Sequence, residues 1–215
     1  RPLLADPDWG AKIAAGKACD IRRCISCNKG CTDAIQNRQF LSCVLNAENG
    51  YENSRSIQHA AQKKKVAVLG GGPAGLEAAR VAALCGHDVT LFEKTTALGG
   101  QLNIACVPPR KEEMRRAAQD LIHAVCNAGV HLCLAQAPTA QELKDAGFEA
   151  VINAVGAHSA APRIPGIDNV NVADAWKVLA GEQQVYGTVA VIGGGMVGCE
   201  TAEYLAARGC KVSLI

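Results

Sequence analysis

The sequence predicts an α/β protein in which two βαβ units follow a cysteine-rich segment. Residues 66–92 align without a gap on residues 189–215, and 13 of the 27 aligned positions are identical. Each copy has an apolar run, a glycine-rich turn, an amphipathic stretch and a second apolar run, which is the pattern of a Rossmann-like βαβ unit. Before the first copy stand four cysteines with the spacing C-x2-C-x3-C-x11-C.

The pattern of apolar residues places the individual elements. In the first copy the run Val66–Leu69 predicts a strand, and a helix follows the glycine turn. The stretch between the two copies holds further elements of the same sheet. They are a helix at Lys111–Asn127, a strand at His131–Leu134, a helix at Gln141–Ala146 and a strand at Ala150–Val155.

Composition excludes several classes of protein. The 215 residues carry a formal net charge of +2, and residues 1–65 hold eleven Lys and Arg against six Asp and Glu. This mild excess favours a solvated or partner-facing surface, so we expect no nucleic-acid partner. No apolar run of about 18 residues and no signal-peptide pattern is present, so we expect a soluble protein with no membrane segment. Eleven cysteines without a secretion signal indicate a reducing compartment, and we expect the cytoplasm.

The first glycine-rich turn has the spacing G-x-G-x-x-G at Gly70, Gly72 and Gly75. The first glycine permits the tight turn, the second lets a pyrophosphate approach the backbone, and the third allows the helix to pack closely on the strand. The helix that starts at Pro73 and Ala74 then offers unpaired N–H groups to the pyrophosphate. Glu93 ends the second strand, where a carboxylate accepts hydrogen bonds from a ribose.

The second copy repeats the fingerprint at Gly193, Gly195 and Gly198. The same spacing places its ribose-reading residue at position 216, so the choice between NADH and NADPH is not assigned. We expect the chain to be a fragment whose second domain is truncated. On that expectation residues 189–215 are partly disordered or pack on the first domain.

The four cysteines Cys24, Cys27, Cys31 and Cys43 form a metal-ligand set. Four thiolates can hold either a structural zinc ion or an iron–sulfur cluster. Three cysteines within eight residues and one remote cysteine favour a cluster wrapped by one loop, and a neighbouring flavin gives a cluster a partner for single electrons. Most of the other seven cysteines are expected to be small buried hydrophobes. His123, on or beside the apolar stripe of its helix, is expected to be structural.

Several segments, taken in order, resemble one family. They are the start RPLLADPD, the stretch IRRCISCNKGC with Cys43, the fingerprint VAVLGGGPAGLEAA, the segment LGGQL and the second fingerprint VAVIGGG. This set is similar to the C-terminal half of the iron–sulfur flavoproteins among the NADH:flavin oxidoreductases of the old yellow enzyme type. That group includes 2,4-dienoyl-CoA reductase, 2-enoate reductase and trimethylamine dehydrogenase. The resemblance covers essentially the whole chain.

The resemblance implies the ligands of each site. The four cysteines would hold one 4Fe-4S cluster, and FAD would lie on the first fingerprint and on residues after the second apolar run of the first copy. The second fingerprint would hold NAD(P)H. The positions assigned to FAD beyond the glycines and Glu93 are Lys94, Gly99, Gly100, Gln101 and Gly156. Gly156 ends the stretch Ala154-Val155-Gly156, where the family often has Ala-Thr-Gly. Because Val155 stands in place of the threonine, the family's threonine contact near FAD is not assigned to this chain.

The resemblance also implies a function and a domain plan. We expect a cluster segment at 1–55, an FAD domain at 56–170 and the start of an NAD(P)H domain at 171–215. Electrons would pass from NAD(P)H through FAD and the cluster to FMN in an N-terminal β/α barrel of the same polypeptide. FMN would there reduce an activated C=C bond of an unsaturated acid or acyl-CoA. No catalytic acid or base is expected within these residues.

Two alternatives remain open at this point. The chain can belong to an amine dehydrogenase of the trimethylamine type, with ADP in the first site as a structural ligand. It can also be a stand-alone electron-transfer subunit. The x3 gap between Cys27 and Cys31 favours the reductase branch over the amine dehydrogenases.

Overall fold

The computed structural model describes residues 1–160 and 162–215 and divides them into two compact units. The first unit comprises residues 1–100 and 113–156, and the second comprises residues 101–112 and 157–215. Each unit has its own parallel sheet. The domain borders expected near residues 55 and 170 stay predictions.

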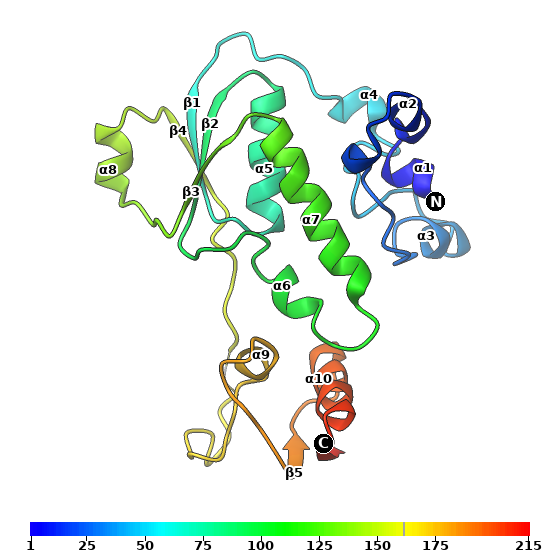
Figure 1. The fold of residues 1–215 in the computed structure, drawn as a ribbon, viewed down its shortest axis with the longest axis vertical. Coiled ribbons are helices and arrows are strands. Elements are labelled where there is room, and N and C mark those ends of the chain that lie inside the picture. Colours follow the sequence, from blue (N-terminus) through cyan, green and yellow to red (C-terminus); the bar gives the residue numbers. More distant parts are fainter. Residues whose placement is uncertain (161) are drawn as a thin grey trace. The chain divides into compact units, whose positions relative to one another are not determined.

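The first unit contains a four-stranded parallel sheet with the order β3-β2-β1-β4 (Figure 1). Its strands are β1 (Lys65–Leu69), β2 (Asp88–Glu93), β3 (His131–Leu134) and β4 (Ala150–Asn153). Parallel neighbours need crossover connections, and helices α5 (Pro73–Leu84), α7 (Glu112–Asn127) and α8 (Ala140–Asp145) supply them. The predicted α/β class is confirmed.

One face of this sheet forms the core. Alternate residues of the two central strands, Val66 and Val68 of β1 with Val89 and Leu91 of β2, are at most 4% exposed. Helices α5 and α7 lie on one side of the sheet and cover this face, whereas α8 lies on the other side (Figure 1). Every second residue of the strands faces this side of the sheet, and the apolar stripes of the two helices pack against those residues. Together they form one apolar layer.

The predicted elements between the two repeats are present, with small shifts at their ends. The strand expected at 150–155 stops at Asn153, because β4 pairs only with β1 and Asn153 lies opposite the last residue of β1, Leu69. The helix expected at 141–146 starts one residue earlier, because Thr139 caps it. The backbone N–H of Glu142 donates to Thr139 Oγ1 (3.3 Å), and the N–H of Thr139 donates to the Glu142 carboxylate (2.7 Å).

The cysteine-rich segment has short helices and is held together by polar contacts. The helices are α1 (Pro2–Ala5), α2 (Trp9–Ala14), η1 (Ala18–Asp20), α3 (Thr32–Gln36) and α4 (Glu52–Arg55). The buried carboxylate of Asp6 accepts hydrogen bonds from the N–H of Arg22 (2.8 Å), the N–H of Asp8 (3.1 Å) and Nζ of Lys12 (2.6 Å). One carboxylate thus joins parts of the segment that are 16 residues apart.

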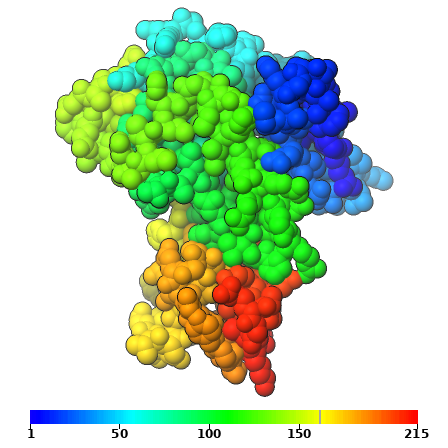
Figure 2. Space-filling model, viewed as in Figure 1, coloured from blue at the N-terminus to red at the C-terminus, as the bar shows by residue number. Residues whose placement is uncertain are grey.

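The same segment is fixed to helix α7. Arg23 donates its backbone N–H to Asp120 Oδ2 (3.0 Å), and its guanidinium forms an ion pair with the same carboxylate. In the space-filling view the blue segment lies against the green surface of the helix (Figure 2). The cysteine-rich segment is therefore attached to the four-stranded sheet through helix α7 and belongs to the same unit.

The second unit contains a two-stranded parallel sheet of β5 (Thr188–Val191) and β6 (Lys211–Leu214), joined by α10 (Met196–Ala207). Two shorter helices, α6 (Leu102–Ala105) and α9 (Ala175–Leu179), belong to the same unit. Lys111 Nζ pairs with Glu200 at 2.6 Å, and Arg110 pairs with Glu203, so residues 110 and 111 are tied to α10. None of the helices in the described ranges is long and apolar enough to cross a membrane.

The packing of α5 generates a first prediction. Leu76 is fully buried in the core, whereas Leu84 on the same helix is 42% exposed. We expect Leu76→Ala to lower the free energy of unfolding by about 2–5 kcal/mol, since it leaves a cavity. The matched control Leu84→Ala should cost under about 1 kcal/mol. Urea unfolding followed by circular dichroism measures both, and similar losses would contradict this account of the core.

A second prediction concerns the second unit, for which the sequence indicates partial disorder. Strands β5 and β6 form a sheet of two strands, and their side chains are half-buried or exposed. Such a pair opens locally at low cost. We expect amide hydrogen exchange in 188–214 to be faster than in 65–93. Equal protection of the two βαβ units would overturn the expectation of partial disorder.

Candidate cofactor sites

The first glycine fingerprint forms the turn between β1 and α5. Gly70 has φ +108, a region that side chains rarely allow, and its N–H donates to the carbonyl of Phe92 at 2.8 Å. Gly72 is the N-cap of α5, and Pro73 occupies the first turn of the helix, where no N–H is needed. The helix therefore begins immediately beside the carboxyl ends of β1 and β2.

Gly75 brings the first turn of α5 against the end of β1. A Cβ atom at Gly75 would overlap the carbonyl oxygen of Gly70, and it would also lie 3.3 Å from the Cβ of Ala154. By contrast, a Cβ at Gly72 would have its nearest neighbour, the Cα of Gly100, at 3.9 Å. The two glycines thus differ in role: Gly75 is required by packing, and Gly72 leaves open space beside the helix N-terminus.

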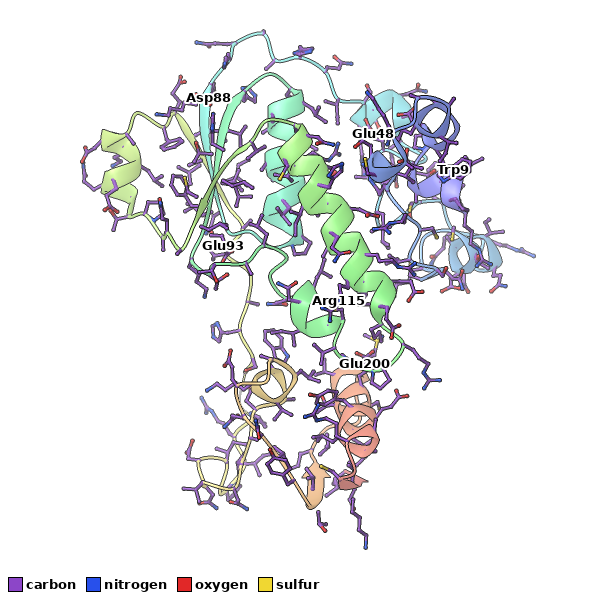
Figure 3. The ribbon with its side chains drawn as sticks, in the orientation of Figure 1. Trp9, Glu48, Asp88, Glu93, Arg115 and Glu200 are labelled. Carbon is purple, nitrogen blue, oxygen red and sulfur yellow. The ribbon has the colours of Figure 1, made fainter. Side chains whose placement is uncertain are left out.

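Glu93 lies at the carboxyl end of β2, next to this turn (Figure 3). Its Oε2 accepts a hydrogen bond from the N–H of Gly71 (2.6 Å), and its Oε1 accepts from the N–H (2.8 Å) and Oγ1 (2.9 Å) of Thr95. Burial by itself would raise the pKa of Glu93, but these hydrogen bonds outweigh it and the pKa is lowered. The carboxylate is therefore ionised at neutral pH and orients the glycine turn.

The segment after β2 folds back on the fingerprint. The N–H of Gly99 donates to the carbonyl of Gly71 at 2.8 Å, and a Cβ at Gly100 would lie 2.7 Å from the Cα of Gly72. The structure therefore brings together six predicted positions: Gly70, Gly72, Gly75, Glu93, Gly99 and Gly100. It also adds two residues that the sequence did not single out, Gly71 and Thr95, whose only signal is their place beside the fingerprint and Glu93.

The remaining predicted FAD positions lie around this turn or outside the first unit. Pro73 and Ala74 are exposed at the start of α5, and Lys94 is exposed after β2. Gly156 is exposed with φ +77, two residues beyond Ala154. Gln101 belongs to the second unit, where its Nε2 donates to the carbonyl of Ala157 at 2.8 Å. These four positions and Gln101 stay predictions as cofactor contacts.

The second fingerprint has the same backbone geometry as the first. Gly193 has φ +110, and its N–H donates to the carbonyl of Ile215 at 2.8 Å, as Gly70 does to Phe92. Gly195 is the N-cap of α10, and a Cβ at Gly198 would overlap the carbonyl oxygen of Gly193. Both repeats therefore build the same turn at a helix N-terminus, although the residues of the second one are more exposed.

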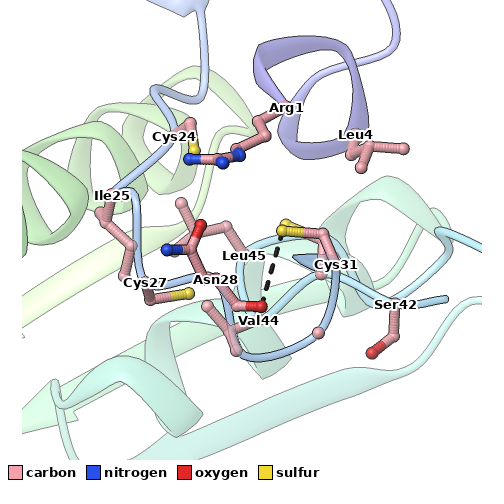
Figure 4. Close-up of a pocket in the computed structure, with 12 residues that line it drawn as sticks. Arg1, Leu4, Cys24, Ile25, Cys27, Asn28, Cys31, Ser42, Val44 and Leu45 are labelled. Atoms are coloured by element: carbon pink, nitrogen blue, oxygen red, sulfur yellow. Dashed lines mark hydrogen bonds between the residues drawn. The ribbon is translucent and has the colours of Figure 1, made fainter. Parts of the chain in front are cut away.

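The four cysteines of the spacing motif line one pocket in the first unit. The sulfurs of Cys24, Cys27 and Cys31 point toward it, and the guanidinium of Arg1 reaches into the same space (Figure 4). Apolar side chains are part of the lining: Leu4, Ile25, Val44 and Leu45. The polar residues Arg1, Asn28 and Ser42 also line it, and the four cysteines are half-buried. Four thiols gathered in one pocket fit a group that takes thiolate ligands.

The loop that carries these cysteines is held in an uncommon conformation. Ser26 and Asn28 both have positive φ, and the N–H of Ser26 donates to the sulfur of Cys24 at 3.3 Å. A Cβ at Gly30 would lie 2.6 Å from the carbonyl oxygen of Ser42, whose N–H donates to the carbonyl of Gly30 at 2.7 Å. The loop therefore places Cys43 beside the first three cysteines and already directs one backbone donor at a sulfur.

The other cysteines are less buried than expected. Cys106 is buried, but Cys19, Cys126 and Cys199 are exposed. Four of the seven are buried or half-buried, namely Cys85, Cys106, Cys133 and Cys210, and the three exposed ones depart from the expected burial. His123 is partnered, as predicted: its Nε2 lies 2.7 Å from Oδ1 of Asp20.

Comparison with known proteins identifies the class. Residues 64–215 match the family model described as pyridine nucleotide-disulphide oxidoreductase. Because this match covers more than half of the chain, the chain belongs to the pyridine nucleotide-disulphide oxidoreductase family. Membership confirms the prediction of an oxidoreductase domain with flavin and NAD(P) sites.

Several relatives are reductases or oxidases, and others are amine dehydrogenases. The chain is 57% identical over 215 residues to a bilirubin reductase of Mediterraneibacter gnavus, and 43% identical over 222 residues to an NADH oxidase of Thermoanaerobacter brockii. In both comparisons all of this chain aligns with 34% of the relative. A solved 2-naphthoyl-CoA reductase matches with a TM-score of 0.95 and 34% identity, over 100% of this chain and 33% of that one. The predicted resemblance to the NADH:flavin oxidoreductases is confirmed, and the chain spans about a third of the length of these relatives.

The contrast between Gly75 and Gly72 generates a third prediction. We expect Gly75→Ala to lower the free energy of unfolding by about 1–3 kcal/mol, because the methyl group overlaps the Gly70 carbonyl. Gly72→Ala should cost about 1 kcal/mol or less, since its methyl group enters open space. Chemical denaturation of the two variants tests this, and equal losses would mean that the packing of α5 on β1 is not what requires glycine.

Proposed function

We propose that this chain is the electron-transfer part of a flavin and iron–sulfur oxidoreductase. Reducing equivalents pass from NAD(P)H through FAD and a 4Fe-4S cluster to FMN in a β/α barrel of the same polypeptide, where an activated C=C bond is reduced. The observation that carries the proposal is the presence, in one chain, of two matching glycine turns and a pocket of four thiols.

The first glycine turn supports FAD as its ligand. The free N–H groups at the start of α5 and the open space beside Gly72 suit a pyrophosphate, which the helix dipole attracts. Glu93 is ionised and next to the turn, where it can accept hydrogen bonds from a ribose once its bond to Gly71 is exchanged. The second turn, built alike, suits the pyrophosphate of NAD(P)H. Bound flavin supplies the chemistry that links a hydride donor to a one-electron carrier.

The spacing of the thiols favours a cluster over zinc. Tetrahedral zinc with Zn–S bonds of about 2.3 Å holds its sulfurs about 3.8 Å apart. Within the described ranges no three of these four sulfurs lie within 4.8 Å of one another. As placed, these thiols do not form a compact tetrahedral zinc site. A four-iron cluster accepts the same four thiolates. The side chain of Arg1 has to leave the pocket for it, and the N–H of Ser26 then stabilises the negative sulfur of Cys24.

The relatives support reduction of an unsaturated substrate. One is named for bilirubin and another for 2-naphthoyl-CoA, an aromatic acyl-CoA, and both are reductases. An unsaturated acid or acyl-CoA is the substrate class that we propose for the whole protein. The alternatives are an amine dehydrogenase with ADP on the first turn, and a stand-alone electron-transfer subunit.

The fourth prediction tests the ligands on the full-length protein purified without oxygen. We expect about four iron and four sulfide per chain, together with FAD and FMN, and a visible absorption band that dithionite bleaches. Cys31→Ser should remove iron and sulfide but keep FAD, since Cys31 lines only the thiol pocket. The matched control Cys133→Ser, in strand β3 outside that pocket, should keep iron, sulfide and FAD.

Flavin reduction by NADH or NADPH separates the alternatives. In stopped flow, Cys31→Ser should still show reduction of FAD but no turnover of an enoate or acyl-CoA. Gly195→Val should slow reduction of FAD without releasing it, because the added side chain enters the space beside α10. ADP in place of FAD would favour the amine dehydrogenase. If the unsubstituted protein contains zinc but no sulfide, and Cys31→Ser loses that zinc, the proposal of a cluster is overturned.

A further inference from the structure

A second group of ligand-type side chains lies on the first unit, where η1 meets α7. The sulfur of Cys19, a carboxylate oxygen of Asp20 and a ring nitrogen of His123 all lie within 4.8 Å of one another. It is the one such group that the described residues contain. Cys19 is exposed, and the side chains of Asp20 and His123 are 29% and 39% exposed, so an ion in solution can reach them.

The distances are near those of a tetrahedral zinc site. With ordinary bond lengths, zinc holds a sulfur and an oxygen ligand about 3.6 Å apart, and a nitrogen and an oxygen ligand about 3.4 Å apart. Here Cys19 Sγ lies 3.7 Å from Asp20 Oδ1, and His123 Nε2 lies 2.7 Å from the same oxygen. The sulfur–oxygen distance thus already fits, and the sulfur lies within 4.8 Å of the ring nitrogen. The imidazole would move away from the carboxylate by less than an ångström as the ion enters between them.

The rest of the group orients these ligands. Asn127, one helical turn after His123 on α7, donates from Nδ2 to Asp20 Oδ1 at 2.9 Å. The hydrogen bond with His123 and that from Asn127 outweigh burial and lower the pKa of Asp20, so the carboxylate is ionised at neutral pH. Arg23, three residues after η1, pairs with Asp120, which lies one turn before His123 on α7.

We propose that Cys19, Asp20 and His123 form a surface binding site for Zn²⁺, with a water molecule as the fourth ligand. One thiolate, one imidazole and one carboxylate make a ligand set that suits zinc and other borderline ions, whereas Mg²⁺ and Ca²⁺ prefer oxygen alone. Cysteine binds zinc as the thiolate. The ion joins the cysteine-rich segment to α7 and stabilises their contact. This site uses none of the four cysteines of the pocket.

The fifth prediction tests the site with the metal alone. The iron, sulfide and flavin contents of the full-length protein are measured first. Zinc is then titrated into this protein, and a chelator of known affinity sets the concentration of free zinc. We expect one tightly bound zinc per chain, lost in Cys19→Ser and weakened more than about tenfold in His123→Gln. Cys126→Ser is the matched control, because Cys126 is an exposed thiol on α7 that is outside the group. It should bind zinc as the unsubstituted protein does.

Cobalt gives a second readout that does not depend on stoichiometry. Co²⁺ bound by Cys19 should produce a thiolate charge-transfer band in the near ultraviolet, absent in Cys19→Ser and present in Cys126→Ser. Circular dichroism establishes that each variant is folded. Equal zinc binding by the unsubstituted protein and by the three variants Cys19→Ser, His123→Gln and Cys126→Ser would overturn the site. The group would then be only a hydrogen-bonded contact between η1 and α7. Loss of zinc in Cys126→Ser as well would also overturn it. Neither result bears on the thiol pocket, which Cys31→Ser tests separately.

Discussion

The close approach of helix α5 to the end of strand β1 is the constraint on which the first site depends. Because Gly75 has no side chain, the first turn of α5 can contact the carbonyl of Gly70, and the helix N-terminus then points at the carboxyl edge of the sheet. That edge carries Glu93, and the turn at Gly99 and Gly100 folds onto it. A larger residue at position 75 would move the helix and with it every other part of this site.

The second repeat shows that this constraint belongs to the sequence pattern rather than to its surroundings. Gly193 and Gly198 repeat the φ value, the hydrogen bond across the turn and the close contact, although the second sheet has two strands and the first has four. Local chemistry therefore suffices to form the turn. What differs between the repeats is burial, which follows from how many strands and helices surround each one.

The cysteine-rich segment depends on a different kind of interaction. It has little regular structure, so polar side chains replace the ladder hydrogen bonds of a sheet: Asp6 gathers the chain at Asp8, Lys12 and Arg22. Asp20 and Arg23 of the segment contact helix α7, which lies outside it. These contacts hold the cysteine-rich segment, which contains the thiol pocket and Cys19, against helix α7. Helix α7 carries His123 and covers the sheet.

The sequence by itself determined the α/β class, both glycine turns and the set of four cysteines. Each is encoded within a short stretch, by residue types that alone satisfy a backbone or ligand requirement. Only the tertiary structure decided that Thr95 and Gly71 share the carboxylate of Glu93, that Gln101 belongs with the second unit, and that Cys19 is exposed beside a histidine 104 residues away. Those facts depend on how distant segments pack, and no local pattern records that packing.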